Sequence, residues 1–160
     1  MHKSGRVSAF ITAAVLVALI LPAAAQAKTI YVNSGVSGAK IGMSVSKAVK
    51  KLGKVRRIEK DTYYGPTYWR RSFGKKSNGH YAVAMESDGS NKVVGFFIWS
   101  RSYLTKKRIH VGSSATTLKK SYGKSLHKTA DGYMLKGKSA TTTFEVTKSK
   151  ISLIWMSGVV

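Results

Sequence analysis

Cysteine is absent from this sequence of 160 residues, and its absence excludes several kinds of protein. No disulfide can form, no thiol can act as a nucleophile, and no thiolate can bind a metal. A bacterial lipid anchor, which is attached to a cysteine, is excluded as well. Stability must therefore come from packing, for which eight Tyr, five Phe and three Trp supply large apolar areas.

Acidic residues are scarce, because six Asp and Glu stand against 28 Lys and Arg, for a formal net charge of +22 at pH 7. A charge of this size bears on binding partners rather than on fold. An exported basic protein meets anionic polymers such as wall teichoic or uronic acids, lipid headgroups and extracellular DNA. The same composition is also typical of a solvated basic surface without a specific partner, and it leaves both interpretations open.

The usual catalytic motifs are missing too. The histidines share no H-x-x-x-H spacing, and no G-x-S-x-G or G-x-x-x-x-G-K-[ST] pattern occurs. Asp88 and Asp131 lie in turn sequences, Glu145 is expected on the solvent side of a strand, and Glu59 and Asp61 lie among basic residues. We therefore predict a protein that is not an enzyme, with no catalytic residue, no metal site and no cofactor.

The N-terminus has the pattern of a secretory signal peptide. A short basic head within residues 2–6 is followed by an apolar core at 10–21 and by Ala-Gln-Ala at 25–27. The core is short for a membrane span, which needs about 20 apolar residues. We predict a cleaved signal at 1–27 and a single secreted domain at 28–160, without a transmembrane span after cleavage. The alternative is an uncleaved anchor.

Two segments of the mature chain, 41–54 and 111–124, align over fourteen positions, of which five are identical. Each segment predicts a short helix. Ser44 or Ser114 is placed to cap the N-terminus, and a glycine nine residues later is placed to end the helix.

Period-two hydrophobic patterns and turn sequences follow each predicted helix. The predicted fold class is α+β, with two tandem units at about 40–103 and 109–157. Each unit is a short helix followed by three or four antiparallel strands, with the helices packed on one face of the sheet. The predicted strands are 55–60, 68–73, 80–86 and 93–100 in the first unit, and 133–136, 141–146 and 151–156 in the second.

The segment Ile41-Gly42-Met43-Ser44, followed by Val49 and Gly53, resembles the opening of the BamE/SmpA outer-membrane assembly lipoproteins and of the β-lactamase inhibitor protein family. The second segment departs from that opening, with Ser113 in place of the Met and Lys119 in place of the Val. The resemblance implies short helices against an antiparallel sheet, doubled in tandem in the inhibitor family, and a habit of binding proteins. It does not imply β-lactamase as the target, because fold does not fix function.

Two stretches, 63–76 and 99–108, interleave aromatic and basic residues, and we predict the binding surface there. Aromatic rings stack on sugars or bases, while Arg and Lys hold phosphate or carboxylate. Within these stretches Phe73 and Trp99 are expected to point inward, and Tyr63 and Tyr64 to be exposed beside a Gly-Pro turn. The predicted binding residues are Tyr64, Tyr68, Trp69, Arg70, Arg71, Lys75, Lys76, Arg101, Lys106, Lys107 and Arg108.

Together these features predict a secreted, non-catalytic binding protein of the cell envelope or extracellular space. It would capture an anionic polymer or an acidic protein surface, without specific nucleic-acid recognition. Three alternatives stay open: an inhibitor-like binder of one exported enzyme, a wall-active hydrolase, and an extracellular nucleic-acid binder.

Overall fold

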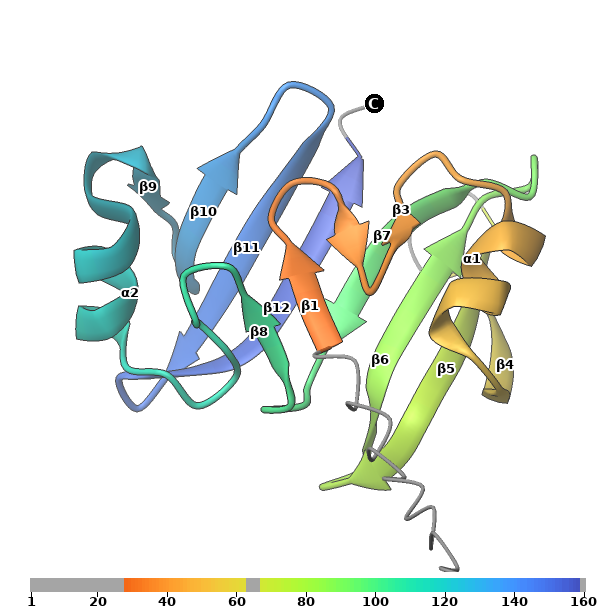
Figure 1. Cartoon of the computed structure of the whole chain (residues 1–160), viewed down its shortest axis with the longest axis horizontal. Coiled ribbons are helices and arrows are strands. Elements are labelled where there is room, and N and C mark those ends of the chain that lie inside the picture. The colour runs from red at the N-terminus through yellow and green to blue at the C-terminus, as the bar shows by residue number, and fades with distance from the viewer. Residues whose placement is uncertain (1–27, 63–66, 159–160) are drawn as a thin grey trace, which may run out of the picture.

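The computed structural model describes residues 28–62 and 67–158 of the chain. The predicted signal at 1–27 lies outside the described residues, as do Tyr63 and Tyr64. The arrangement of the described elements is shown in Figure 1.

An eight-stranded sheet dominates the fold, and every neighbouring pair within it is antiparallel. The seven predicted strands are all present, with bounds that differ by a few residues. The eighth strand was not predicted, because its three residues are too few to show a period. In spatial order the strands are β4 (Val55–Asp61), β5 (Tyr68–Ser77), β6 (His80–Ser87), β7 (Val93–Ile98), β12 (Lys150–Gly158), β11 (Ala140–Thr147), β10 (Gly132–Lys136) and β9 (Leu126–Lys128).

A second, four-stranded sheet is built from short strands that the sequence patterns do not indicate. Strand β1 (Lys28–Tyr31) pairs in parallel with strand β8 (Tyr103–Thr105), so that Lys28 lies opposite Tyr103 and Ile30 lies opposite Thr105. The other pairs are antiparallel. The strands in spatial order are β3 (Ala39–Lys40), β2 (Gly35–Val36), β1 (Lys28–Tyr31) and β8 (Tyr103–Thr105).

Both predicted helices are present, as α1 (Val45–Leu52) and α2 (Ala115–Tyr122), and a 3-10 turn, η1 (Gly123–Ser125), follows the second. Ser114 caps α2 as expected, because its side chain accepts a hydrogen bond from the Thr117 N–H at 3.0 Å. Ser44 has the extended backbone of a cap, yet its side chain makes no capping bond. The glycines that end the helices have positive φ, 89° at Gly53 and 52° at Gly123.

The predicted fold class is wrong. The chain is mostly β, and its strands do not divide into two tandem helix-plus-sheet units. Strands from both halves form one continuous sheet through the pairing of β7 with β12, where Phe97 lies opposite Trp155, and a separate four-stranded sheet is added. An unpaired sheet edge exposes a row of backbone donors and acceptors, and joining the two edges satisfies them. Periodicity identifies strands but does not say which strands pair.

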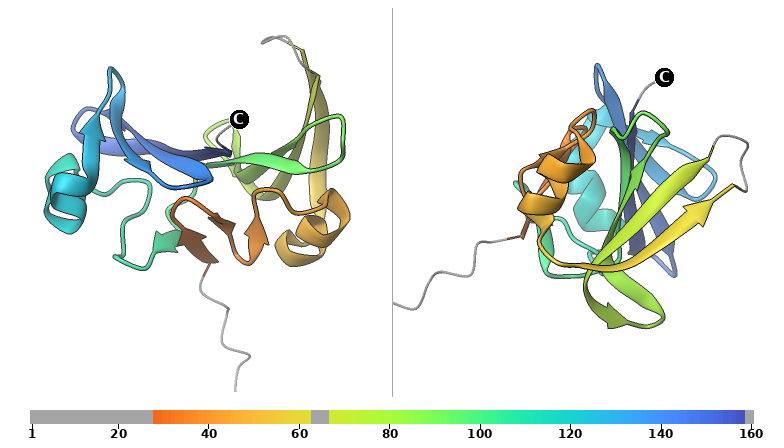
Figure 2. Two further views of the ribbon diagram at one scale, coloured as in Figure 1. Left: turned by 90° about the horizontal axis from the view of Figure 1, so that it is seen from above. Right: turned by 90° about the vertical axis from the view of Figure 1, so that its right-hand side faces the viewer.

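The core lies between the eight-stranded sheet and a layer made of both helices and the small sheet. Figure 2 shows that this layer covers one side of the large sheet only, and that the sheet curls toward its other side at the β4–β5 end. Phe96 and Phe144 from the large sheet, Ala48 from α1 and Leu118 from α2 are fully buried in one cluster. The other side of the sheet, the open face, remains for side chains that point away from this core.

Candidate functional site

Aromatic side chains occupy the open face of the large sheet. The buried core residues Ile98 of β7 and Ile154 of β12 lie opposite each other. The adjacent pair, Phe97 of β7 and Trp155 of β12, also lie opposite each other. Successive side chains of a strand point to opposite faces. Phe97 and Trp155 therefore lie on the open face, where both are half-buried.

Four rings follow one another along this face, and we call them the aromatic row: His80, Trp99, Phe97 and Trp155. The centroids of His80 and Trp99 are 4.9 Å apart with 7° between their planes. Trp99 and Phe97 are 5.8 Å apart at 14°, and Phe97 and Trp155 are 6.3 Å apart at 18°. Near-parallel rings at these separations attract one another, so the four side chains form one stacked row from β6 to β12.

Arg70 borders the aromatic row and is held there by an ion pair. Its Nε donates to Glu86 Oε1 at 3.0 Å, and its Nη2 donates to the same oxygen at 2.5 Å. The guanidinium lies over the Phe97 ring, 5.1 Å from the centroid, as a cation–π contact. The Glu86 side chain is only 16% exposed, and its negative charge is paired with the positive charge of Arg70.

A cleft of about 830 Å³ lies at the end of the row where His80 and Trp99 are placed. The loops between β5 and β6 and between β7 and β8 contribute to its lining, together with the adjoining ends of β11 and β12. Among the residues that the structure describes, five cationic side chains line it, all of them exposed, and no Asp or Glu does. We call this site the basic cleft, and its cations are Lys28, Arg56, Lys75, Arg101 and Lys150.

Two glycines make room for this arrangement. Gly112 has a φ of +98°, and a Cβ placed there would come within 3.0 Å of Arg101 Nε, so the Arg101 side chain packs where only glycine leaves space. Gly74 has a φ of +80° beside a bulge in β5, and a Cβ there would meet the Ala82 Cβ at 2.8 Å. Both glycines line the basic cleft.

The structure distributes the predicted binding residues over several surfaces. Tyr64 lies outside the described residues, and only Lys75 and Arg101 line the basic cleft. Arg70 faces the open side, whereas its neighbour Arg71 faces the helix side and donates to Ser87 Oγ at 2.9 Å.

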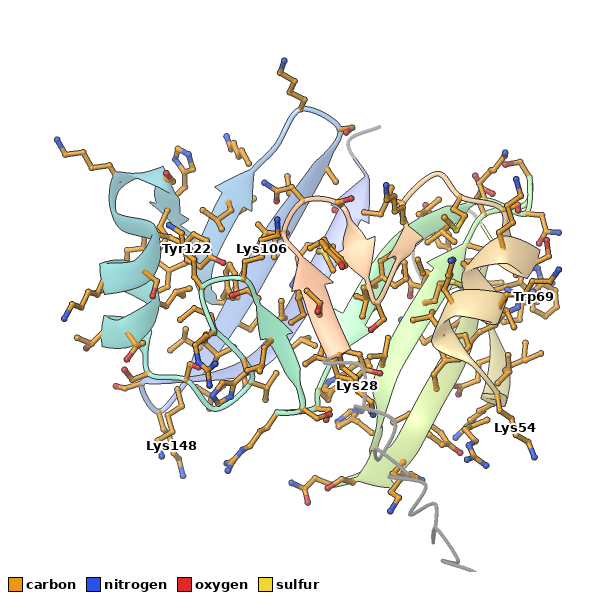
Figure 3. All side chains as sticks on the ribbon, viewed as in Figure 1. Lys28, Lys54, Trp69, Lys106, Tyr122 and Lys148 are labelled. Carbon is orange, nitrogen blue, oxygen red and sulfur yellow. The ribbon has the colours of Figure 1, made fainter. Side chains whose placement is uncertain are left out.

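The remaining predicted residues lie away from the cleft lining. Tyr68 is half-buried at the start of β5, and the neighbouring Trp69 is 40% exposed on the helix side, beside α1 in Figure 3. Lys76 is exposed near the end of β5, and Arg108 is exposed in the turn after β8. A common surface is not formed, because alternation along β5 sends adjacent residues to opposite faces.

Lys106 and Lys107 line a separate pocket of about 610 Å³ beside Tyr31 and Tyr122. The Lys107 Nζ donates to the Ser121 carbonyl at 2.6 Å and lies 4.7 Å from the centroid of the Tyr122 ring. Burial raises the pKa of the Tyr122 hydroxyl above its usual value of 10.0. Figure 3 labels Lys106 and Tyr122 on this side of the molecule.

Sequence reasoning missed several residues that the fold brings together. Phe73 is fully buried as predicted, but the inward placement of Trp99 is wrong, because Trp99 stacks in the aromatic row on the open face. Trp155 lies on the open face by the same strand alternation, and the period-two pattern of its strand could have placed it there. The other missed residues, Lys28, Arg56, His80 and Lys150, come from separate segments that no sequence pattern joins.

Three carboxylates among the described residues make separate contacts with different partners. Glu59 pairs with Arg57 at 2.8 Å, and Glu86 pairs with Arg70. Asp88 accepts from the Lys92 N–H at 2.9 Å and from Ser90 Oγ at 2.8 Å in the turn between β6 and β7. Among the residues that the structure describes, no group of three His, Asp or Glu side chains is placed to hold a metal ion.

The sequence matches no protein-family model, and it matches no curated protein. The fold is similar to that of the uncharacterized protein yfeY from Escherichia coli, with a TM-score of 0.51 and 12% identity, over 79% of this chain and 95% of that one. An extracellular protein containing a SCP domain from Bacillus anthracis str. Ames gives a TM-score of 0.45 and 13% identity, over 73% of this chain and 43% of that one. The resemblance to the BamE/SmpA and β-lactamase inhibitor families stays a prediction.

Within the described ranges, no helix has both the length and the apolar character needed to cross a bilayer.

Proposed function

We propose that the protein captures an anionic polymer of the cell envelope or extracellular space and binds it without chemical change. The observation that carries this proposal is the basic cleft, whose five cations come from separate segments and whose lining, within the described part of the chain, includes no carboxylate. Cations gathered in one concave site raise the local concentration of an anionic ligand. The site therefore favours a ligand that presents several negative charges in succession.

The location of the cations distinguishes this proposal from attraction by net charge alone. Scattered surface lysines, such as Lys47 on α1 and Lys120 on α2, are also exposed. Exposed charges farther apart than about 8 Å are largely screened at physiological ionic strength. A cluster around one cleft keeps its advantage because several of its charges act on the same stretch of polymer.

A binding role without catalysis is supported by the state of the carboxylates, of which Glu86 and Asp88 are engaged in hydrogen bonds. A role outside the cytoplasm follows from the signal pattern at 1–27. We therefore place the polymer in the wall or outer surface of the producing cell.

Co-sedimentation with purified cell-wall sacculi tests this proposal. The purified protein is mixed with intact sacculi and with sacculi stripped of their anionic polymers, each at low and high salt. We expect the protein to pellet with intact sacculi at low salt, and to stay in solution after stripping or at high salt. Equal pelleting with stripped sacculi, or no pelleting under any condition, would contradict the proposal.

A further inference from the structure

We propose that the polymer is a glycan whose sugar rings carry carboxylate or phosphate groups, and that it runs from the basic cleft along the aromatic row. This inference rests on the proposed function and names the class of ligand for the same site. Capture by charge alone requires only cations. The aromatic row adds a requirement for rings.

The cleft and the row are one continuous site because two residues belong to both. His80 and Trp99 line the cleft, and their stacked rings begin the row that continues through Phe97 to Trp155. A polymer bound to the cleft cations therefore meets aromatic rings as it leaves the cleft along the open face. The helices and the small sheet lie on the other side of the large sheet (Figure 2), and on the open face the Arg70 guanidinium lies over the Phe97 ring.

The chemistry of the row selects among anionic polymers. Polyphosphate and poly(glycerol phosphate) have no ring that an aromatic side chain can stack against. A pyranose presents an apolar face of C–H groups, which can pack against the apolar ring of Trp99 where that ring lines the cleft. The row therefore contributes free energy to binding only when the polymer carries rings.

The polar lining of the cleft favours sugars over nucleic-acid bases. Single-stranded nucleic acid also combines negative charge with stacking rings. The cleft, however, is lined by hydroxyl and amide groups that can donate and accept hydrogen bonds with the hydroxyls of a sugar. Ser100 and Ser102 lie 2.7 Å apart through their Oγ atoms at its rim. The polar lining residues are Ser77, Asn78, Ser100, Ser102, Thr147 and Ser152.

A pair of tryptophan variants separates stacking from charge. Trp99→Leu removes a ring of the row, and Trp69→Leu is the matched control, because Trp69 is exposed on the helix side of β5. Neither tryptophan belongs to the core cluster. Affinities of the wild type and both variants are measured at one salt concentration for four probes: polygalacturonate, a phosphomannan, inorganic polyphosphate and a thymidine oligonucleotide.

We expect Trp99→Leu to weaken binding of a charged glycan by at least about five-fold. The affinity of Trp99→Leu for polyphosphate should stay within about two-fold of wild type. Trp69→Leu should change the affinity for the glycans and for polyphosphate by no more than about two-fold. The glycan with the larger loss tells whether carboxylate or phosphate is the preferred acid group. Equal losses for glycans and polyphosphate, no loss for either glycan, or a loss confined to the oligonucleotide would overturn the inference.

The same titrations distinguish this inference from the proposed function. If wild type binds polyphosphate and glycans alike and Trp99→Leu changes nothing, the glycan assignment is wrong while capture by charge stands. If wild type binds none of the four probes, both are wrong.

Discussion

At the scale of single residues, the structure separates side chains that look equivalent in the sequence. Ser44 and Ser114 occupy the same place before their helices, yet only Ser114 makes a side-chain cap. Arg70 and Arg71 are neighbours, yet they serve opposite faces of the sheet. Strand alternation separates the two arginines. Both serines bridge to the large sheet, Ser44 to Lys92 and Ser114 to Lys150, so that contact does not account for their difference in capping.

The two serines give a direct test of the cap assignment. Ser114→Ala should lower the free energy of unfolding by about 1 kcal/mol, because the Thr117 N–H loses its acceptor. Ser44→Ala should change it by less than about 0.5 kcal/mol. Urea denaturation of both variants measures the difference, and equal losses would show that the two serines cap alike.

Gly35 is required by a close approach in the small sheet. A Cβ at this position would lie 1.9 Å from the Ala39 carbonyl oxygen, a distance that forces the backbone to move. We expect Gly35→Ala to cost about 1–3 kcal/mol of folding stability.

The matched control for that substitution is Gly89→Ala. Gly89 is exposed in a turn, and a Cβ there would meet nothing within 4 Å. Its change should stay within about 0.5 kcal/mol. A Gly35→Ala protein as stable as the control would mean that β2 and β3 do not approach as described.

At the scale of elements, the sequence patterns predicted seven of the eight strands of the large sheet and both helices. Alternation, helical spacing and turn residues are local signals, and they are strong in elements of six or more residues such as β6 and β7. The two-residue strands β2 and β3 carry no such signal. The parallel pairing of β1 with β8 joins segments more than seventy residues apart and depends on tertiary packing.

The hairpin between β6 and β7 should respond to acid through Asp88. The Lys92 backbone N–H, foremost, and the Ser90 hydroxyl hold the pKa of Asp88 below its usual value of 3.8. Because the folded-state pKa is the lower one, the stabilisation is complete above the unfolded pKa and is lost as pH falls through the folded pKa.

Asp88→Asn keeps an oxygen that can accept from Lys92 but removes the titrating carboxylate. We therefore expect a smaller drop in Tm between about pH 5 and about pH 2 for this variant than for wild type. Thermal unfolding followed by circular dichroism over that range measures it. Identical acid profiles for the two proteins would show that Asp88 does not contribute.

At the scale of the whole molecule, the candidate site exists only because the two halves of the chain share one sheet. Pairing of β7 with β12 brings Trp155 beside Phe97, and segments from both halves place Lys75 of β5, Arg101 of the β7–β8 loop and Lys150 of β12 around one cleft. The sequence indicated the kind of chemistry, basic and aromatic. It could not predict the location, because the residues involved are spread from Lys28 to Trp155.

In our proposal the basic cleft, rather than net charge, captures the polymer. Two triple variants with the same net charge test this claim. One is Lys75→Gln, Arg101→Gln, Lys150→Gln in the cleft, and the other is Lys47→Gln, Lys120→Gln, Lys138→Gln at exposed positions outside its lining.

The measurement is the dissociation constant of each triple variant for an anionic wall polymer at one salt concentration. We predict that the cleft variant binds about five-fold or more weakly than wild type, because each lost contact contributes up to about 1 kcal/mol. The control variant should stay within about two-fold. Equal weakening in both would contradict the account, since affinity would then follow net charge and the cleft would have no special role.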